Sequence, residues 1–189
     1  MIVAFDANIL VYLFDENANA PTSKPTGLPV ERCRERVEYL IATLQRKKAK
    51  IIIPTPSLAE SLVSAQDGAP ERLSIIKRSK HFRISPFDER AAVEYAAMQA
   101  ERRRNGRKSE APTRAKAKFD DQIIAIAAIE GATTIYSDDD HIKKLAGTKF
   151  EVFGIVDLLL PPEDDQRSFE FETDDEDGDI ADHPDFGRF

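Results

Sequence analysis

The chain has 189 residues, of which 41% are hydrophobic and 32% are charged, and this length suits one domain with an extension. No run of apolar residues approaches the roughly 20 that are needed to cross a bilayer. The single cysteine, Cys33, excludes an internal disulfide and a thiolate metal site, which fits a reducing compartment. We therefore expect a cytoplasmic protein with no signal peptide and no membrane contact.

Charge is unevenly distributed along the chain. The formal net charge is −7, but residues 163–189 contain 12 acidic and 2 basic residues, a net of −10, whereas residues 1–162 carry a net of +3. The acidic segment has few aliphatic residues, and this composition is typical of disorder. We predict one folded domain over residues 1–160 and an acidic, disordered C-terminal tail over residues 161–189.

Hydrophobic periodicity predicts strands and helices that alternate along the domain. Short apolar runs, often β-branched, indicate buried strands, and apolar residues at helical spacing indicate amphipathic helices. In chain order we predict a strand at 2–5, helices at 9–14 and 37–44, a strand at 51–53, helices at 55–63 and 69–79, a strand at 81–85, helices at 88–103 and 121–130, a strand at 133–136, a helix at 138–145 and a strand at 149–153. Polar segments at 17–29 and 102–118 predict loops. The alternation predicts an α/β fold, a parallel sheet with helices on both faces.

Acidic residues follow three of the predicted strands. Asp6 ends the first strand, Glu60 follows the second and Asp139 follows the fourth, while Asp121 begins an apolar helix. Ligands of open parallel sheets bind outside the carboxyl ends of the strands, so we expect these side chains to lie together. Carboxylates held close together raise one another's pKa or bind a cation. Oxygen ligands without a histidine or cysteine cluster favour Mg²⁺ or Mn²⁺ over Zn²⁺.

Each acid taken alone also has a simpler interpretation. Asp6 is suited to cap a helix, Glu60 to a solvated helix face, and Asp121 to the positive end of a helix dipole. Four independent caps at the strand ends of one architecture are a weaker explanation than one shared site. The pattern therefore favours a single divalent-cation site.

The same residues resemble the motifs of the PIN-domain family, in particular the VapC-like toxin ribonucleases of toxin–antitoxin pairs. The resemblance covers roughly residues 1–160 and rests on four motifs in order. These are Asp6-Ala7-Asn8, Pro54-Thr55-Pro56-Ser57-Leu58-Ala59-Glu60, Asp121-Gln122-Ile123-Ile124-Ala125-Ile126-Ala127-Ala128 and Ser137-Asp138-Asp139-Asp140-His141-Ile142.

Two positions of the motif register stay open. Asp120 could replace Asp121, although the Ile-Ala pair of the third motif has the right offset only from Asp121. Asp138 or Asp140 could replace Asp139, where the spacing from Ser137 alone favours Asp139.

The resemblance implies a PIN-like nuclease domain that is a Mg²⁺- or Mn²⁺-dependent endoribonuclease hydrolysing the phosphodiester bonds of RNA, as the toxin of a toxin–antitoxin pair. It implies RNA as substrate, an antitoxin protein as partner and a second copy of the chain in a homodimer. The implied catalytic and metal-binding residues are Asp6, Glu60, Asp121 and Asp139, with Asn8 and Ser137 orienting Asp6. A dication held in this way lowers the pKa of a bound water and neutralises charge on a phosphodiester.

A basic stretch leads into the helix of Asp121. We predict that it follows an RNA backbone next to the cation, and the ordinary alternative is a solvated loop. Its basic residues are Arg102, Arg103, Arg104, Arg107, Lys108, Arg114, Lys116 and Lys118.

Two other functions fit parts of the pattern. One is a non-catalytic PIN-like module that binds RNA or protein. The other is a phosphatase of the haloacid-dehalogenase type, whose fold also opens with a strand and an aspartate and carries late acids like Asp138 and Asp139. That phosphatase needs a second acid two residues after its nucleophile, where this chain has Asn8.

Overall fold

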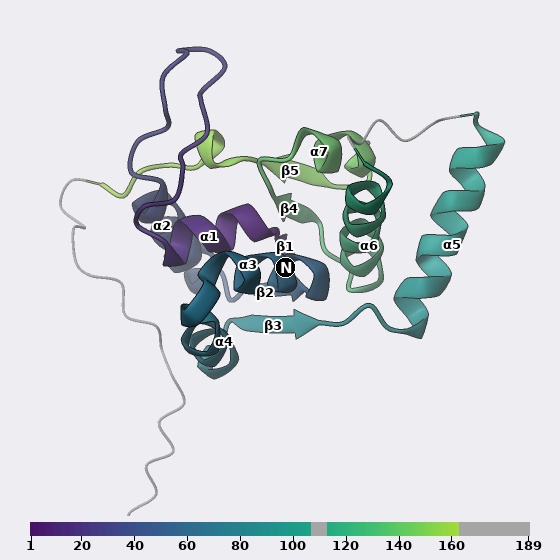
Figure 1. Cartoon of the computed structure of the whole chain (residues 1–189), viewed down its shortest axis with the longest axis horizontal. Coiled ribbons are helices and arrows are strands. Elements are labelled where there is room, and N and C mark those ends of the chain that lie inside the picture. Colours follow the sequence, from purple (N-terminus) through teal and green to yellow (C-terminus); the bar gives the residue numbers. More distant parts are fainter. Residues whose placement is uncertain (107–112, 163–189) are drawn as a thin grey trace, which may run out of the picture.

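A computed structural model describes residues 1–106 and 113–162, and its centre is a five-stranded sheet (Figure 1). The strands pair in the order β3-β2-β1-β4-β5, and every pairing is parallel. The strands are β1 (Ile2–Phe5), β2 (Lys50–Pro54), β3 (Phe82–Ser85), β4 (Thr134–Tyr136) and β5 (Glu151–Phe153). The predicted parallel α/β sheet is therefore confirmed.

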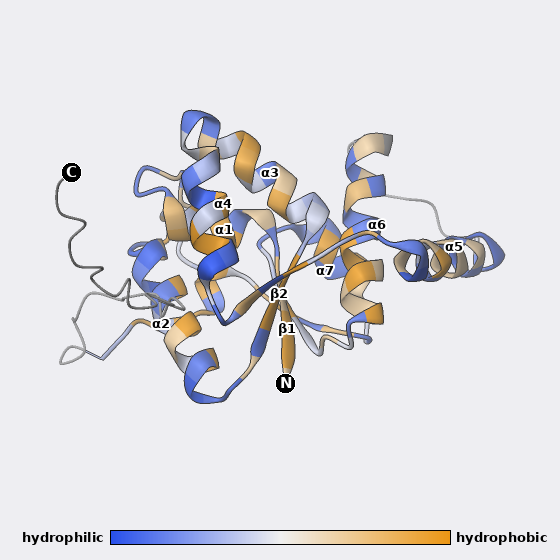
Figure 2. Ribbon diagram, turned by 90° about the horizontal axis from the view of Figure 1, so that it is seen from below, coloured by the Kyte–Doolittle hydropathy of each residue, from blue (hydrophilic) through white to orange (hydrophobic). Residues whose placement is uncertain are grey.

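Helices connect the strands and cover both faces of the sheet, as predicted. Figure 2 shows the apolar strands β1 and β2 running between helices on either side. The helices are α1 (Ala7–Phe14), α2 (Cys33–Arg46), α3 (Thr55–Ala65), α4 (Ala69–Arg78), α5 (Glu89–Arg104), α6 (Arg114–Ile129) and α7 (Asp140–Ala146), with 3₁₀ turns at Gln66–Gly68 and Ile155–Asp157. None of the helices in the described residues is long and apolar enough to cross a membrane.

Alternation along the strands builds a core on each face of the sheet. Val3 and Phe5 of β1 belong to the core under α1, α2 and α4, whereas Ala4 between them belongs to the core under α6 and α7. Side chains of a strand point to opposite faces in turn, so a strand covered on both sides is apolar throughout. This explains why β1 and β2 are continuous apolar runs.

The basic stretch is not one loop. The predicted helix at 88–103 is confirmed as α5 and extends to Arg104, whereas α6 begins at Arg114 rather than at Asp121. Thr113 caps α6 by accepting a hydrogen bond from the Lys116 amide at 3.1 Å, which stabilises the earlier start. Residues 107–112, including Arg107 and Lys108, and the predicted acidic tail from residue 163 lie outside the described residues.

The carboxyl ends of β1 and β4 lie side by side at the centre of the sheet. The connection from β1 leads towards β2 and that from β4 towards β5, so the topology reverses between these two strands. The Asp6 amide donates to the Tyr136 carbonyl at 3.0 Å, which places Asp6 beside Ser137. Parallel sheets bind ligands at such a reversal, and the first and fourth motifs meet there.

Candidate carboxylate site

Asp6 is a buried carboxylate that immediately follows β1. It begins α1 as the N-cap, and its Oδ1 accepts hydrogen bonds from the Ala7 amide at 2.7 Å and from Ser57 Oγ at 3.1 Å. Its Oδ2 accepts from Ser137 Oγ at 2.6 Å. Asp6 therefore both caps α1 and lies in the candidate site, because α1 starts where the sheet topology reverses between β1 and β4.

Ser137 and Asn8 lie where the sequence predicts, beside Asp6. The Ser137 hydroxyl donates to Asp6 and accepts from the Asp139 amide at 3.1 Å, so it joins the first and fourth motifs. The Asn8 side chain makes longer hydrogen bonds, 3.4 Å to Asp6 Oδ2 and 3.4 Å from the Asp138 amide. Both residues hold the segments that carry Asp6 and Asp139.

The three consecutive aspartates after Ser137 have different surroundings. Asp138 turns towards the chain after β5 and accepts from the Ile155 amide at 2.7 Å. Asp140 is exposed and pairs with Lys24 at 3.1 Å. Asp139 caps α7 through the His141 amide at 2.7 Å, and its Oδ2 bonds to Lys116. Asp139 is thus the member of the three whose contacts lead back to the other candidate ligands.

Asp120 occupies the place that the sequence assigned to Asp121. It is buried, its Oδ2 lies 2.6 Å from His141 Nδ1, and its Oδ1 lies 4.0 Å from Lys116 Nζ. Asp121 turns instead towards α5, where Arg102 donates to both of its oxygens at 2.5 and 3.1 Å. The Gln99 amide adds a bond of 2.5 Å to Asp121. The Ile-Ala offset pointed to Asp121, whereas the packing of α6 between α5 and α7 directs Asp120 towards the site.

Glu60 connects the acids electrostatically from its position on α3. Partial burial raises its pKa first, and the charges of Asp6, Asp120 and Asp139 raise it further, while Lys116 opposes them. The direction of its pKa shift therefore links the exposed Glu60 side chain to all three aspartates. We call Asp6, Glu60, Asp120 and Asp139 the carboxylate quartet.

Burial sets the protonation of the quartet together with these charges. The pKa of Asp6 and that of Asp120 are raised chiefly by desolvation, against hydrogen bonds from Ser137 and His141 respectively. Burial also opposes ionisation of Asp139, but the Lys116 hydrogen bond and backbone amides lower its pKa overall. The site therefore favours a positive charge, which Lys116 supplies in part.

Lys116 and His141 are site residues whose role the sequence analysis missed. The sequence placed Lys116 only among RNA contacts, yet its ammonium group bonds to Asp139 inside the site. Lys116 precedes Asp120 by one helical turn, and residues four apart share a helix face, so this spacing was the available signal. His141 follows Asp139 by two residues, and no sequence pattern connects it with Asp120.

The donor set of the quartet suits a hard divalent cation. All four side chains offer carboxylate oxygens, which Mg²⁺ and Mn²⁺ prefer. In the described residues no three His, Cys, Asp or Glu side chains yet converge closely enough to hold an ion. The ammonium group of Lys116 lies between Asp120 and Asp139, so binding of an ion requires a rearrangement of these three groups.

The basic stretch divides into residues with different partners. Arg102 is committed to Asp121, and Lys116 lies in the site. Arg103, Arg104 and Lys118 have exposed side chains. Contact with RNA stays a prediction for these three and for Arg114.

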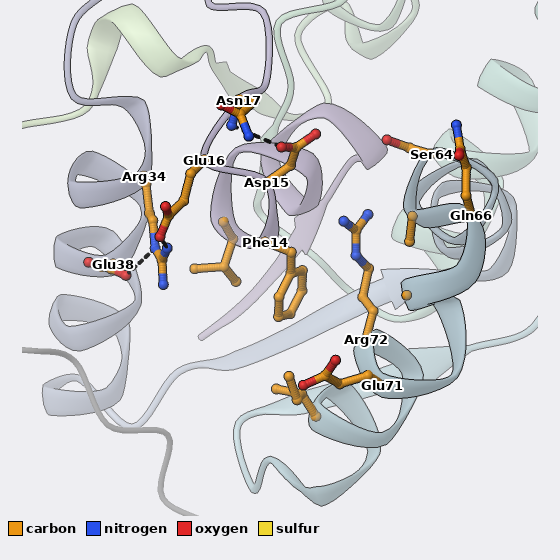
Figure 3. Close-up of a pocket in the computed structure, with 14 residues that line it drawn as sticks. Phe14, Asp15, Glu16, Asn17, Arg34, Glu38, Ser64, Gln66, Glu71 and Arg72 are labelled. Atoms are coloured by element: carbon orange, nitrogen blue, oxygen red, sulfur yellow. Dashed lines mark hydrogen bonds and ion pairs between the residues drawn. The ribbon is translucent and has the colours of Figure 1, made fainter.

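A separate pocket of about 630 Å³ lies between α1, α2, α3 and α4 (Figure 3). Four carboxylates and two guanidinium groups line it, and none of its lining residues belongs to the quartet. Arg34 pairs with Glu16 and Glu38, and the Arg72 guanidinium lies over the Phe14 ring at 5.3 Å. The excess of acids makes this pocket unsuited to a nucleic-acid backbone.

Comparison with solved structures finds the same fold in bacterial toxin–antitoxin proteins. The VapBC2 complex of Rickettsia felis, bound to a DNA fragment from its promoter, aligns with a TM-score of 0.56 at 17% identity, over 82% of this chain and 98% of that chain. DNA-bound VapBC from Salmonella typhimurium aligns at 0.52 and 13% identity, over 82% and 98%. Mycobacterium tuberculosis VapC20, described as a sarcin–ricin loop cleaving toxin, aligns at 0.52 and 14%, over 77% and 95%. At these identities the likeness shows a shared fold.

A family model supplies the assignment that structural likeness leaves open. The PIN domain model matches residues 30–148, a range that contains Glu60, Asp120 and Asp139, while Asp6 lies before it. No curated protein matches the chain. The match sets aside the haloacid-dehalogenase alternative. With the parallel sheet, the carboxylates at its centre and this match together, the chain belongs to the PIN domain family.

Proposed function

We propose that this chain is a divalent-metal-dependent endoribonuclease whose ligands are Asp6, Glu60, Asp120 and Asp139. The observation that carries the proposal is the chain of contacts through Ser137, Lys116 and His141 that joins Asp6, Asp139 and Asp120. Asp6 and Asp139 follow β1 and β4 at the reversal point of a parallel sheet, where ligands bind. Asp120 of α6 is joined to Asp139 through Lys116, and the pKa of Glu60 on α3 responds to all three aspartates. The choice of Asp120 over Asp121 follows from their contacts, because Arg102 and Gln99 already occupy Asp121.

The residues of the site have distinct tasks in this proposal. A bound Mg²⁺ or Mn²⁺ supplies neutralisation of phosphodiester charge and activation of water. The quartet holds the ion, Ser137 fixes the Asp6 carboxylate relative to the Asp139 backbone, and His141 fixes Asp120. Asp6 and Asp120 are buried, so water screens their attraction for the ion less than it would at the surface. The exposed side chains of Arg103, Arg104 and Lys118 would hold the RNA backbone beside α6.

The related toxins support the class of substrate and partner. VapC20 is described as a toxin that cleaves the sarcin–ricin loop, and two of the matching structures are VapBC complexes bound to DNA. We infer that this chain also acts on RNA and pairs with an antitoxin, as a homodimer in the cytoplasm. These assignments rest on the family and on the quartet.

Cleavage of end-labelled single-stranded RNA tests the function. The assay compares wild type, Asp6→Asn, Asp120→Asn and Asp121→Asn in Mg²⁺, in Mn²⁺ and in EDTA. We expect wild type to cut RNA only in the presence of metal. Asp6→Asn and Asp120→Asn should reduce cleavage to background. Asp121→Asn should retain cleavage, with its folding verified by circular dichroism. The two α6 variants are matched, since each removes one charge from neighbouring positions.

Two results would overturn the assignment. Cleavage by Asp6→Asn at the wild-type rate would place the activity elsewhere or in a contaminant. Absence of cleavage by wild type across several unrelated RNAs, with RNA binding retained, would favour the non-catalytic module instead.

A further inference from the structure

Lys116 holds oxygen atoms that a divalent cation in the quartet would need. Its Nζ donates a hydrogen bond to Asp139 Oδ2 and lies 4.0 Å from Asp120 Oδ1. Arg102, by contrast, pairs with Asp121 and not with a quartet member. The ammonium group of Lys116 is therefore a counter-ion inside the quartet.

We propose that the Lys116 ammonium group is an internal competitor of the divalent cation: it neutralises the quartet in the metal-free protein and must leave Asp139 before an ion binds. This rests on the proposed function, because it concerns the same four carboxylates. Mg²⁺ contacts its oxygen ligands at about 2.0–2.1 Å. An ammonium group bonded to the same oxygen blocks that approach, and its charge repels the ion.

The surroundings show which group can move. The Lys116 side chain is 42% exposed, whereas the carboxyl groups of Asp139 and Asp120 are 20% and 6% exposed. His141 contacts both aspartates, through its amide at Asp139 and through its ring at Asp120. A flexible lysine stem swings more readily than two carboxylates held by an adjacent helix. Loading of the ion should thus displace Lys116 furthest, with smaller movements that bring the carboxylates within reach of the ion.

A lysine in this position would lower the affinity for metal and keep the empty site folded. Without this ammonium group, the mutual repulsion of the four carboxylates would be less compensated, which raises the cost of holding them ionised. With it, an ion must replace an existing interaction, so binding is weaker than for the same carboxylates alone. The site would then load only when the free metal concentration is sufficient.

Titration of the full-length protein with Mn²⁺ measures this competition directly, with free ion followed by electron paramagnetic resonance. The variants are Lys116→Met, which keeps length without charge, Lys116→Arg, which keeps charge, and Lys118→Met. Lys118 is exposed on the same helix, so its variant removes an equal charge outside the site. We expect about tenfold tighter Mn²⁺ binding by Lys116→Met, as befits loss of one partly screened like charge. Lys116→Arg and Lys118→Met should stay within about twofold of wild type.

Chemical labelling of wild type provides a measurement that needs no variant. An amine-acylating reagent, quantified by mass spectrometry, reports how accessible Lys116 and Lys118 are with and without Mn²⁺. Displacement predicts a several-fold rise in modification of Lys116 on adding Mn²⁺, with Lys118 unchanged as the internal reference.

The outcomes separate this proposal from the ribonuclease assignment. Equal or weaker Mn²⁺ binding by Lys116→Met, equal tightening in Lys118→Met, unchanged labelling of Lys116, or absence of any Mn²⁺ binding would each overturn the competitor role. Tighter Mn²⁺ binding by Lys116→Met and increased labelling of Lys116, without RNA cleavage by wild type, would support the competitor role and contradict the nuclease assignment. RNA cleavage by wild type with unchanged Mn²⁺ affinity of Lys116→Met would support the nuclease assignment and contradict the competitor role.

Discussion

Asp120 and Asp121 are consecutive on α6, yet their carboxylates lie against different helices. Asp120 Oδ2 is 2.6 Å from the ring of His141 on α7, and Asp121 Oδ1 is 2.5 Å from the guanidinium of Arg102 on α5. Successive residues of an α-helix point about 100° apart, so neighbours in sequence can serve different interfaces. One aspartate therefore contacts α7 beside the quartet, and the other packs against α5.

Removal of Arg102 should destabilise the fold. Arg102→Met leaves the buried Asp121 carboxylate with the Gln99 amide alone, and loss of one partner of a buried ion pair costs about 3–5 kcal/mol. Urea unfolding at pH 7 measures the loss, with Arg103→Met, an exposed neighbour, as the control that should unfold like wild type. If Arg102→Met had wild-type stability and bound RNA more weakly, Arg102 would instead be an RNA contact.

His141 should act by positioning Asp120. Its ring nitrogen Nδ1 meets the carboxylate in a buried environment, as partners that orient metal ligands do. We expect His141→Leu to weaken Mn²⁺ binding by about 10–100-fold, the usual cost of such a loss. His141→Asn can place an amide nitrogen near the Nδ1 position and should recover part of the affinity. Equal affinities for the two variants would argue against positioning.

Ser137→Ala should damage two motifs at once. The change removes a donor to Asp6 and an acceptor for the Asp139 amide, both at a fully buried position. Leaving buried polar groups without partners costs about 1–3 kcal/mol each. Thermal unfolding should show lower stability, and Mn²⁺ titration should show weaker binding. Ser137→Thr retains the hydroxyl and is the matched comparison. It should bind metal more tightly than Ser137→Ala, because it can keep the contacts to Asp6 and Asp139.

The stability of the protein should depend on pH because several carboxyl groups have raised pKa values. Asp6, Glu60 and Asp120 have pKa values raised above those of ordinary carboxyl groups, chiefly by burial. The folded state binds their protons more tightly than the unfolded chain does. Their stabilisation is therefore complete below the unfolded pKa of about 4 and is lost as the pH rises through the folded values. Asp139, with a lowered pKa, acts in the opposite sense and loses its contribution in acid.

Urea unfolding in EDTA from pH 4 to pH 8 measures this effect for wild type and Asp6→Asn. Asp6→Asn should lose less stability than wild type as the pH rises, because it lacks one of the carboxyl groups with a raised pKa. Saturating Mg²⁺ should reverse the trend in wild type, since ionised carboxylates bind the ion. Parallel pH profiles of the two proteins in EDTA would contradict the assignment of the raised pKa to Asp6.

The sequence predicted the strands, most helices and the approach of Asp6 to Asp139, because these depend on local periodicity and on the ends of parallel strands. It did not decide between Asp120 and Asp121. That choice depends on which side of α6 faces α5, and the helix there continues from Arg114 through a segment of low hydrophobicity. The Lys116 contact was missed for the same reason: its four-residue spacing from Asp120 indicates a shared face only once the helix is known to begin at Arg114.

The central position of β1 has a consequence for synthesis of the protein. β1 pairs on one side with β2 and on the other with β4, so β1 is synthesised well before residues 134–136, which cover its second edge. A chain emerging from the ribosome thus carries Asp6 and Glu60 long before it acquires Ser137 and Asp139. Incomplete products that end before Ser137 cannot assemble the quartet, so under the proposed function they would lack cleavage activity.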